Sequence, residues 1–292
     1  YCAMEGEDED TGDPRAFSRQ KGWKKIIILC AGSFMNFLLG LVIAVGLSLG
    51  TTEVRVPVIT SFMDGFTLEG ESGLMVGDRI VRVDGHGVWL YADALVYLDR
   101  NDGVSGVDLV VERDGKRIVL DDFPMTRSIE VVENGETAKK FGLSFTQTER
   151  LSLVGRVKYG FLQSVDFVRI VWMSLGDLVT GKVPVSELSG VIGVVDVVSE
   201  EGAKYQSALT GVLSVLSMMA LIAVNLAVMN LLPIPALDGG RIFFVVLNGL
   251  LYAVVRRRIP ERYEGYVHAG AFVVLLALMA VVAFHDVWKI FA

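Results

Sequence analysis

Three long apolar runs dominate the hydropathy pattern of this 292-residue chain. Residues 26–49 contain no charged side chain, and residues 209–230 contain only Thr, Ser and Asn as polar side chains. A third run extends from about residue 266 to residue 288, with an apolar stretch at 269–284 and aromatic side chains near both ends. Each run approaches the roughly 20 residues that a membrane-spanning helix needs. The pattern therefore predicts three transmembrane helices.

Two further segments carry weaker helical patterns. Residues 243–255 are mostly apolar but number only about thirteen, which predicts an interfacial helix rather than a fourth crossing. Residues 151–183 have apolar side chains at helical spacing with charged residues among them, which predicts an amphipathic helix on the outer membrane surface. The apolar positions are Phe161, Val165, Val168, Trp172 and Leu175.

Residues 51–127 follow a strand-like pattern instead. Valines alternate with other residues at 54–58, and two Asp-Gly pairs, at 84–85 and 114–115, separate runs rich in β-branched side chains. Asp-Gly between such runs is a strong hairpin signal. This segment should therefore form a small domain that contains β-hairpins.

The composition agrees with such a mixed chain. Apolar residues make up 52% and charged residues 21%, too apolar for one soluble domain and too charged for a wholly membrane-embedded protein. The net charge of −7 gives no support for nucleic-acid binding. Two cysteines, Cys2 and Cys30, argue against a disulfide framework, and residues 1–25 lack the pattern of a secretory signal peptide.

Basic residues predict how the chain is oriented in the membrane. One cluster precedes the first apolar run and another lies between the second and the third, and both are expected to be cytoplasmic. Residues 51–205 and the C-terminus should then lie outside, with Asp238 near the cytoplasmic face. The clusters are Arg15, Arg19, Lys21, Lys24 and Lys25, and Arg241, Arg256, Arg257, Arg258 and Arg262.

An unusual polar motif follows the second apolar run. Residues 230–240 read Asn-Leu-Leu-Pro-Ile-Pro-Ala-Leu-Asp-Gly-Gly. Pro233 and Pro235 should break the helix and free backbone groups that lipid cannot satisfy. Burying the Asp238 carboxylate without a partner or a metal costs several kcal/mol. A helix end that turns into a polar loop would explain an isolated Asp-Gly, but the combination favours a wet functional site.

The spacing Asn-x-x-Pro-x-x-x-x-Asp-Gly resembles the third-ligand motif of the site-2 proteases, zinc enzymes that cut helices inside membranes. The resemblance implies that Asp238 is a zinc ligand and that Asn230 is catalytic, binding the substrate backbone or the oxyanion. Pro233 and Pro235 would keep the chain unwound, and Gly239 and Gly240 would permit close backbone approach. A plain turn explains each glycine, taken singly, equally well.

Other stretches extend this resemblance along the chain. Residues 31–37 are similar to the family's Ala-Gly-Pro-x-x-Asn-Phe, with Ser33 in place of proline. Residues 188–193 are similar to its Ser-Gly-Pro-x-Gly, with Val191 in place of proline. Residues 1–7 look like the segment that follows the family's first helix and its membrane-associated β-loop.

The family's other two zinc ligands are the histidines of a His-Glu-x-x-His helix, whose glutamate is the general base. None of His86, His268 and His285 has a histidine four residues away. Because the chain also begins with Tyr1 rather than Met, we expect that the segment carrying this helix is missing and that this chain alone is inactive. His268 should lie on the same side as Asp238, where an interfacial residue is the ordinary interpretation and a metal ligand the alternative. His285 and His86 are poorer candidates.

Residues 72–85 look like the core signature of bacterial PDZ domains. The matching positions are Gly73, Leu74, Gly77 and Asp78. The resemblance implies that residues 51–127 bind an extended peptide or protein segment at a sheet edge. Alternatively, the domain could act as a size filter that keeps intact ectodomains away from the membrane site.

Together these features predict a polytopic α-helical membrane protein with an inserted α+β PDZ-like domain, in the bacterial inner membrane and in contact with lipid. The resemblance implies an intramembrane zinc endopeptidase of regulated intramembrane proteolysis, which cleaves single-span membrane proteins such as anti-sigma factors or signal-peptide remnants. The alternative is a non-catalytic membrane PDZ adaptor, and a transporter ranks last because no internal repeat is visible.

The expected segments are a cytoplasmic membrane-associated segment (1–25), a transmembrane helix (26–50), the PDZ-like domain (51–127), an outer linker with the amphipathic helix (128–205), a transmembrane helix with the polar motif (206–240), a cytoplasmic interfacial segment (241–265) and a last transmembrane helix (266–292).

Overall fold

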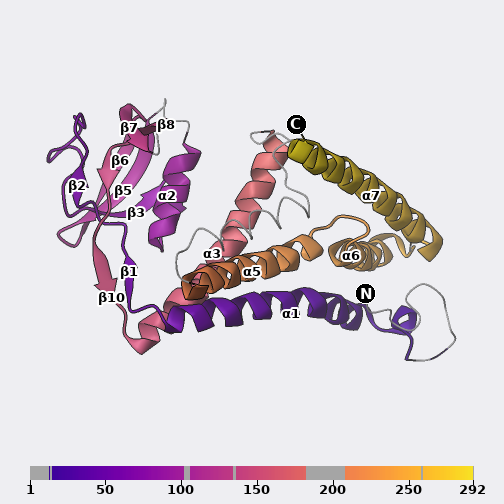
Figure 1. Ribbon diagram of the computed structural model, residues 1–292. Coiled ribbons are helices and arrows are strands. Elements are labelled where there is room, and N and C mark those ends of the chain that lie inside the picture. The colour runs from indigo at the N-terminus through magenta and orange to yellow at the C-terminus, as the bar shows by residue number, and fades with distance from the viewer. Residues whose placement is uncertain are drawn as a thin grey trace. The chain divides into compact units, whose positions relative to one another are not determined.

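The computed structural model divides the chain into two compact units (Figure 1). It describes residues 13, 15–101, 106–133, 136–181, 208–257 and 259–291. The helical unit comprises Tyr1–Leu47 and Phe167–Ala292, and the β-rich unit comprises Ser48–Asp166. The motif-like stretches expected at residues 1–7 and 188–193 lie outside the described residues.

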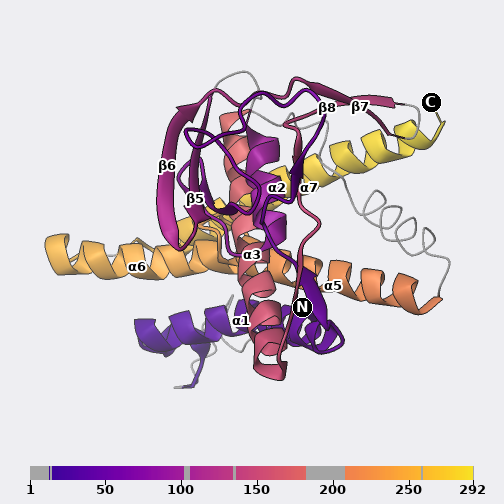
Figure 2. The same ribbon diagram turned by 90° about the vertical axis from the view of Figure 1, so that its left-hand side faces the viewer.

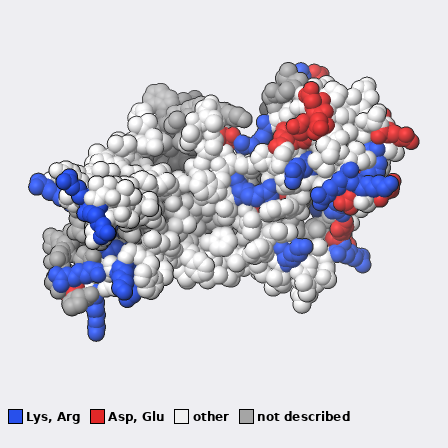
Figure 3. All heavy atoms as spheres, turned by 180° about the vertical axis from the view of Figure 1, so that it is seen from behind, with Lys and Arg blue, Asp and Glu red and all other residues white. Residues whose placement is uncertain are grey.

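Long apolar helices make up most of the helical unit. After a short 3-10 turn, η1 (Phe17–Arg19), come α1 (Gly22–Leu49), α5 (Ala208–Leu231), α6 (Asp238–Val255) and α7 (Glu261–Phe291). Each of the four α-helices contains a stretch long and apolar enough to cross a membrane. In Figure 3, large parts of the visible surface carry no charged side chain, as surfaces that face lipid do. The three predicted apolar helices are therefore confirmed as helices.

The helix after the polar motif is longer than predicted. The sequence indicated a transmembrane segment ending at residue 240 and a short helix at 243–255. Instead, α5 ends at Leu231, and α6 runs for 18 residues from Asp238. The prolines end α5, as the sequence predicted, because they lack an N–H group, and an acidic residue is favoured in the first turn of the next helix. The polar motif is thus a break between two helices, and α6 is a fourth helix of sufficient length to span.

Small residues allow two of these helices to cross closely. A Cβ atom at Gly40 of α1 would lie 2.7 Å from Cγ2 of Val224 and 2.9 Å from the carbonyl oxygen of Ala220, both on α5. Small residues at such crossings are typical of membrane helices, because packing rather than the hydrophobic effect holds them together in lipid. Val171, Val224 and Val228 form a buried cluster nearby, against which Phe37 of α1 packs.

A four-stranded antiparallel sheet forms the centre of the β-rich unit. Its strand order is β4-β3-β5-β6, with β3 (Arg79–Val83), β4 (His86–Gly87), β5 (Val107–Arg113) and β6 (Lys116–Phe123). Figure 2 shows β5 and β6 side by side, with helix α2 (Tyr91–Arg100) in the same unit. The two Asp-Gly pairs form the tight turns β3–β4 and β5–β6, with positive φ at all four residues. Both predicted hairpins are therefore confirmed.

Shorter strand pairs extend this unit beyond the predicted boundary at residue 127. The hairpin β7 (Ile129–Glu133) and β8 (Glu136–Lys140) comes next in the chain. Strands β9 (Leu143–Ser144) and β10 (Thr148–Arg150) then return to pair with β2 (Ser61–Phe62) and β1 (Glu53–Arg55). Helix α3 (Leu153–Thr180) follows, where the sequence predicted an amphipathic helix. The segment expected as a linker therefore contributes strands to the same compact unit.

Candidate functional site at the junction of α5 and α6

The break between α5 and α6 is built by two prolines and a strained alanine. Pro233 and Pro235 follow the end of α5 at Leu231 and cannot donate backbone hydrogen bonds. Ala236 has a φ of +79°, a conformation that residues with a side chain rarely adopt. The chain then enters α6 at Asp238. A short non-helical segment therefore lies between two apolar helices.

Every N–H group of residues 232–237 that can donate has an acceptor. Leu232 donates to the carbonyl of Met229, Ile234 to that of Leu232, and Leu237 to that of Ile234. The Ala236 N–H instead donates to Nδ1 of His268 on α7, over 2.8 Å. Such complete pairing is what non-helical backbone needs inside a membrane protein. The junction is therefore a fixed structure, held in part by a side chain from another helix.

Two glycines allow the loop to fold back onto the first turn of α6. Both are buried. A Cβ atom at Gly239 would lie 2.2 Å from the carbonyl oxygen of Leu232, and one at Gly240 would lie 2.4 Å from that of Ile234. Real Cβ atoms do not approach backbone oxygen so closely. Only glycine fits at both positions without moving the loop.

The Asp238 side chain is only half-buried at this junction. It opens α6, where the positive end of the helix dipole favours a carboxylate. Its Oδ2 atom lies 4.0 Å from the place that a Cβ atom would take at Gly32 of α1. Asn230, half-buried, lies in the last turn of α5. The junction therefore brings together the end of α5, the start of α6 and the middle of α1.

The described side chains do not form a complete metal site at this junction. Among the residues that the structure describes, no three His, Cys, Asp or Glu side chains gather closely enough to hold a metal ion. His268 contacts the loop through Nδ1, as given above. His86 belongs to β4 in the other unit, where its ring stacks on Tyr97 at 5.0 Å. His285 lies in α7, but its side chain is outside the described residues.

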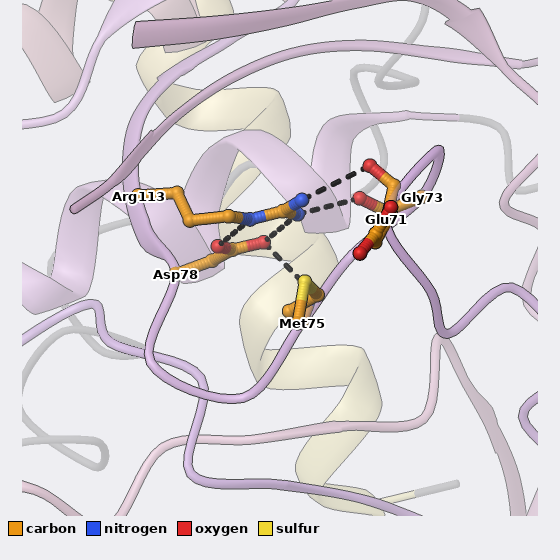
Figure 4. A network of polar contacts seen from close by, with 5 residues as sticks. All are labelled: Glu71, Gly73, Met75, Asp78 and Arg113. Atoms are coloured by element: carbon orange, nitrogen blue, oxygen red, sulfur yellow. Dashed lines mark hydrogen bonds and ion pairs between the residues drawn. The ribbon is translucent and has the colours of Figure 1, made fainter. Parts of the chain in front are cut away.

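Two of the four signature residues, Gly73 and Asp78, belong to a second polar cluster, in the β-rich unit (Figure 4). Asp78 is fully buried and makes a two-pronged ion pair with Arg113, with Nε–Oδ1 and Nη2–Oδ2 distances of 2.7 Å. The hydrogen bonds that Arg113 donates to the Asp78 carboxylate raise the pKa of Arg113 above its ordinary value. Asp78 also accepts the N–H of Met75, and Arg113 donates to the carbonyl of Gly73. This cluster holds the loop before β3 in place.

The other two signature residues also have structural surroundings. Leu74 is fully buried in the core of the β-rich unit. Gly77 has a φ of +97°, which favours glycine. In the described structure these residues therefore shape the loop and fill the core.

Sequence reasoning missed two partners of the α5–α6 junction. The contact of His268 with Ala236 joins residues 32 positions apart, and the approach of Gly32 to Asp238 joins α1 to α6. The only available signal for His268 was its expected place on the same side of the membrane as Asp238. Side-chain contacts between helices distant in the chain are not encoded in local spacing.

Comparison with known proteins agrees with this architecture. The chain is 32% identical to the regulator of sigma-W protease RasP of Bacillus subtilis over 280 residues, which is 95% of this chain and 62% of that protein. It is 31% identical to the zinc metalloprotease RasP of Bacillus licheniformis, with the same coverage of 95% and 62%. A Clostridium perfringens protein named as a zinc metalloprotease is 29% identical over 98% of this chain and 80% of its own length. The chain thus spans about three-fifths of the Bacillus proteins and four-fifths of the clostridial one.

The family comparison covers almost the whole chain. The model of Peptidase family M50 matches residues 1–278, a range that includes the α5–α6 junction and the β-rich unit. The chain belongs to Peptidase family M50, the site-2 proteases.

Proposed function

We propose that this protein acts as an intramembrane zinc endopeptidase, with its chemistry at the α5–α6 junction. The observation that carries the proposal is the half-buried Asp238 carboxylate, presented by a break between two helices that are apolar enough to span a membrane. A carboxylate in such surroundings is expensive unless it has a task. Membership of Peptidase family M50 and relatives named as zinc metalloproteases support the same reaction.

Asp238 is proposed as one ligand of the zinc ion. A hydrolytic zinc site needs three protein ligands and an open position, and the described residues provide one, so the remaining ligands must come from elsewhere. When bound, the metal would lower the pKa of its water to about 7 and polarise the scissile carbonyl. The chain's own contribution is to hold the Asp238 carboxylate at the start of α6, within a loop whose N–H groups are all paired. This fixed geometry is what a metal ligand requires.

Asn230 is proposed to bind the backbone of the substrate. Its amide is half-buried in the last turn of α5, eight positions before Asp238. An amide can donate a hydrogen bond to a carbonyl oxygen and to the charge that develops on it. The prolines at 233 and 235 would keep the intervening chain open, so that an unwound segment of substrate can lie beside it.

We propose single-span membrane proteins as substrates, such as anti-sigma factors or signal-peptide remnants. A single helix can enter from the lipid and unwind locally, whereas a packed bundle cannot. The name of the Bacillus subtilis relative, regulator of sigma-W protease RasP, supports the first class. The orientation expected from the basic clusters, in a bacterial inner membrane, would place the junction near the cytoplasmic face.

The β-rich unit is proposed to be a PDZ-like domain. Its antiparallel sheet, helix α2 and the loop held by Asp78 and Arg113 support this proposal. Such a domain would add an extended peptide to a sheet edge or restrict access of large ectodomains. In either role it selects substrates and takes no part in the hydrolysis.

Cleavage by the product of the natural gene tests the proposed function. The protein is purified, reconstituted in liposomes and mixed with a single-span reporter carrying tags at both ends. We expect cleavage within the hydrophobic segment, abolished by a zinc chelator and by Asp238→Ala, and unchanged by Asp64→Ala on the exposed surface of the β-rich unit. A chain of residues 1–292 alone should not cleave, because its sequence contains no His-Glu-x-x-His motif.

Two results would overturn this proposal. Cleavage that persists in Asp238→Ala would remove Asp238 from the reaction. A natural gene product that binds the reporter through the β-rich unit, but never cuts it, would favour the non-catalytic adaptor.

A further inference from the structure

Among the described residues, His268 is the only side chain that accepts a hydrogen bond from an N–H group of residues 232–237. Leu232, Ile234 and Leu237 donate to nearby carbonyls, whereas Ala236 donates to Nδ1 of His268 at 2.8 Å. The two partners are 32 positions apart and belong to different elements. This bond therefore fastens the loop to α7.

The backbone at Ala236 explains why a side-chain acceptor is needed. Its φ of +79° turns the N–H away from the helical direction, and the proline before it prevents a continuous helix. An unsatisfied N–H in apolar surroundings is strongly unfavourable. Without an acceptor from α7, the loop would have to move to pair this group. Any such movement would displace Asp238, two residues further on.

The imidazole of His268 is held in one orientation. Because Nδ1 accepts a hydrogen bond, it carries the lone pair, and the ring proton lies on Nε2. The ring also packs against Phe244 of α6, with centroids 5.5 Å apart. In the part of the chain that the structure describes, Nε2 is buried and has no hydrogen-bond partner. A histidine used only for packing would not usually carry such a group.

We infer that His268 is a positioning residue, which fixes the loop bearing Asp238 through the bond from the Ala236 N–H to its Nδ1. This inference rests on the proposed function of Asp238 as a metal ligand. It differs from the alternative in which His268 itself binds the metal. Three substitutions separate these roles, because the two ring nitrogens can be replaced one at a time.

The test compares His268→Asn, His268→Gln and His268→Leu in the natural gene product. Asn places an acceptor oxygen where Nδ1 lies, whereas Gln places its polar group nearer to Nε2, and Leu removes both. Hydrogen–deuterium exchange is followed by mass spectrometry in overlapping peptides that resolve residue 236. We expect exchange of the Ala236 N–H to rise about tenfold in the Gln and Leu proteins, and to stay within about threefold of wild type in Asn. His86→Asn, in the β-rich unit, is the matched control and should leave this exchange unchanged.

Cleavage kinetics provide the functional arm of the same test. We expect kcat to fall about tenfold or more in His268→Gln and His268→Leu with little change in KM, and to recover in His268→Asn. Unchanged exchange in the Leu protein would overturn the inference. So would recovery by Gln but not Asn, or loss of bound zinc in all three proteins, which would assign Nε2 as a ligand. If the wild-type protein neither binds zinc nor cleaves, the proposed function fails, while the exchange arm still decides whether His268 holds the loop.

Discussion

Asp78 and Asp238 are two aspartates that each lie next to a glycine, and their surroundings differ. Asp78 is fully buried, and both of its oxygens are paired with Arg113. Asp238 is half-buried at the start of a helix, beside glycines that bring the backbone close. The first carboxylate is enclosed by its partners, whereas the second remains accessible from outside.

Under the proposed function, this difference separates a carboxylate that serves the fold from one that is placed to bind a metal. A fully paired, buried carboxylate contributes to the fold and has little capacity left to bind a ligand. At the α5–α6 junction the donating N–H groups of residues 232–237 are paired with backbone carbonyls and with His268, and the Asp238 side chain is partly exposed at the start of α6. Substitutions at the two places should therefore affect different properties.

The largest effect on stability is expected for Arg113→Leu. This change leaves the buried Asp78 carboxylate without its partner, which costs about 3–5 kcal/mol. Thermal unfolding of the purified protein, followed by a probe in the β-rich unit, should shift strongly downward. Arg79→Leu is the control, because the Arg79–Glu149 ion pair is partly exposed and should contribute about 1 kcal/mol or less. Equal effects of the two changes would contradict the role assigned to Asp78.

Gly240→Ala should be the next most damaging change. Its new Cβ atom would lie 2.4 Å from the carbonyl oxygen of Ile234, so the loop must shift, at a cost of about 1–3 kcal/mol. Gly249→Ala, in the same helix, meets no atom within 4 Å and should stabilise α6 by up to about 1 kcal/mol. Thermal stability and zinc content of both proteins would check this. A harmless Gly240→Ala would show that the loop is not closely packed on α6.

The contact between α2 and α3 in the β-rich unit should weaken as the pH rises. Asp166 and Asp93 are buried and hydrogen-bonded to each other, and burial together with that bond raises the pKa of Asp166 to about 8. Burial and these two acids also raise the pKa of Tyr159. Because the folded state binds the Asp166 proton more tightly, its stabilising contribution is complete below about pH 4 and falls until about pH 8.

Asp166→Asn keeps a hydrogen-bond donor to Asp93 without a titrating group. Melting temperatures of both proteins, measured from pH 5 to pH 9, should therefore diverge, with the wild type losing stability relative to the variant up to about pH 8. Parallel curves would contradict the assignment of a proton to this carboxyl pair.

The smallest effect is expected at Ala236. Its positive φ favours glycine, so Ala236→Gly should be neutral or stabilising by up to about 1 kcal/mol. Ala236→Val should destabilise the loop by a similar or larger amount, because a β-branched residue tolerates this conformation poorly. Melting temperatures of the two proteins would check the sign. A stabilising valine would contradict the backbone conformation described here.

Local sequence patterns predicted the helices and hairpins because their signals are local. An uninterrupted apolar run such as 26–49 and an Asp-Gly pair such as 114–115 each determine their own conformation. The start of α6 at Asp238 was missed because Gly239 and Gly240 suggest a turn by their intrinsic preference. Close packing against the carbonyls of Leu232 and Ile234 instead makes them the first turn of a helix.

Long-range pairings could not be predicted in the same way. Strands β9 and β10 are two and three residues long, and only their partners β2 and β1 define them. The motif at residues 230–240 indicated Asp238 as the candidate site residue, but it did not indicate which contacts position the loop that carries Asp238. The acceptor for the Ala236 N–H comes from α7, and nothing in the spacing of residues 230–240 indicates that helix.

The zinc affinity of the Asp238→Asn protein tests most directly whether Asp238 is a metal ligand. The natural gene product should hold about one zinc ion per polypeptide, and the Asn variant should lose at least about 100-fold in zinc affinity, since even indirect partners of a metal contribute 10–100-fold. Its melting temperature without metal should match that of the wild type, because the amide can still occupy the start of α6. Unchanged zinc affinity in a folded Asp238→Asn protein would contradict the claim that this carboxylate serves chemistry rather than the fold.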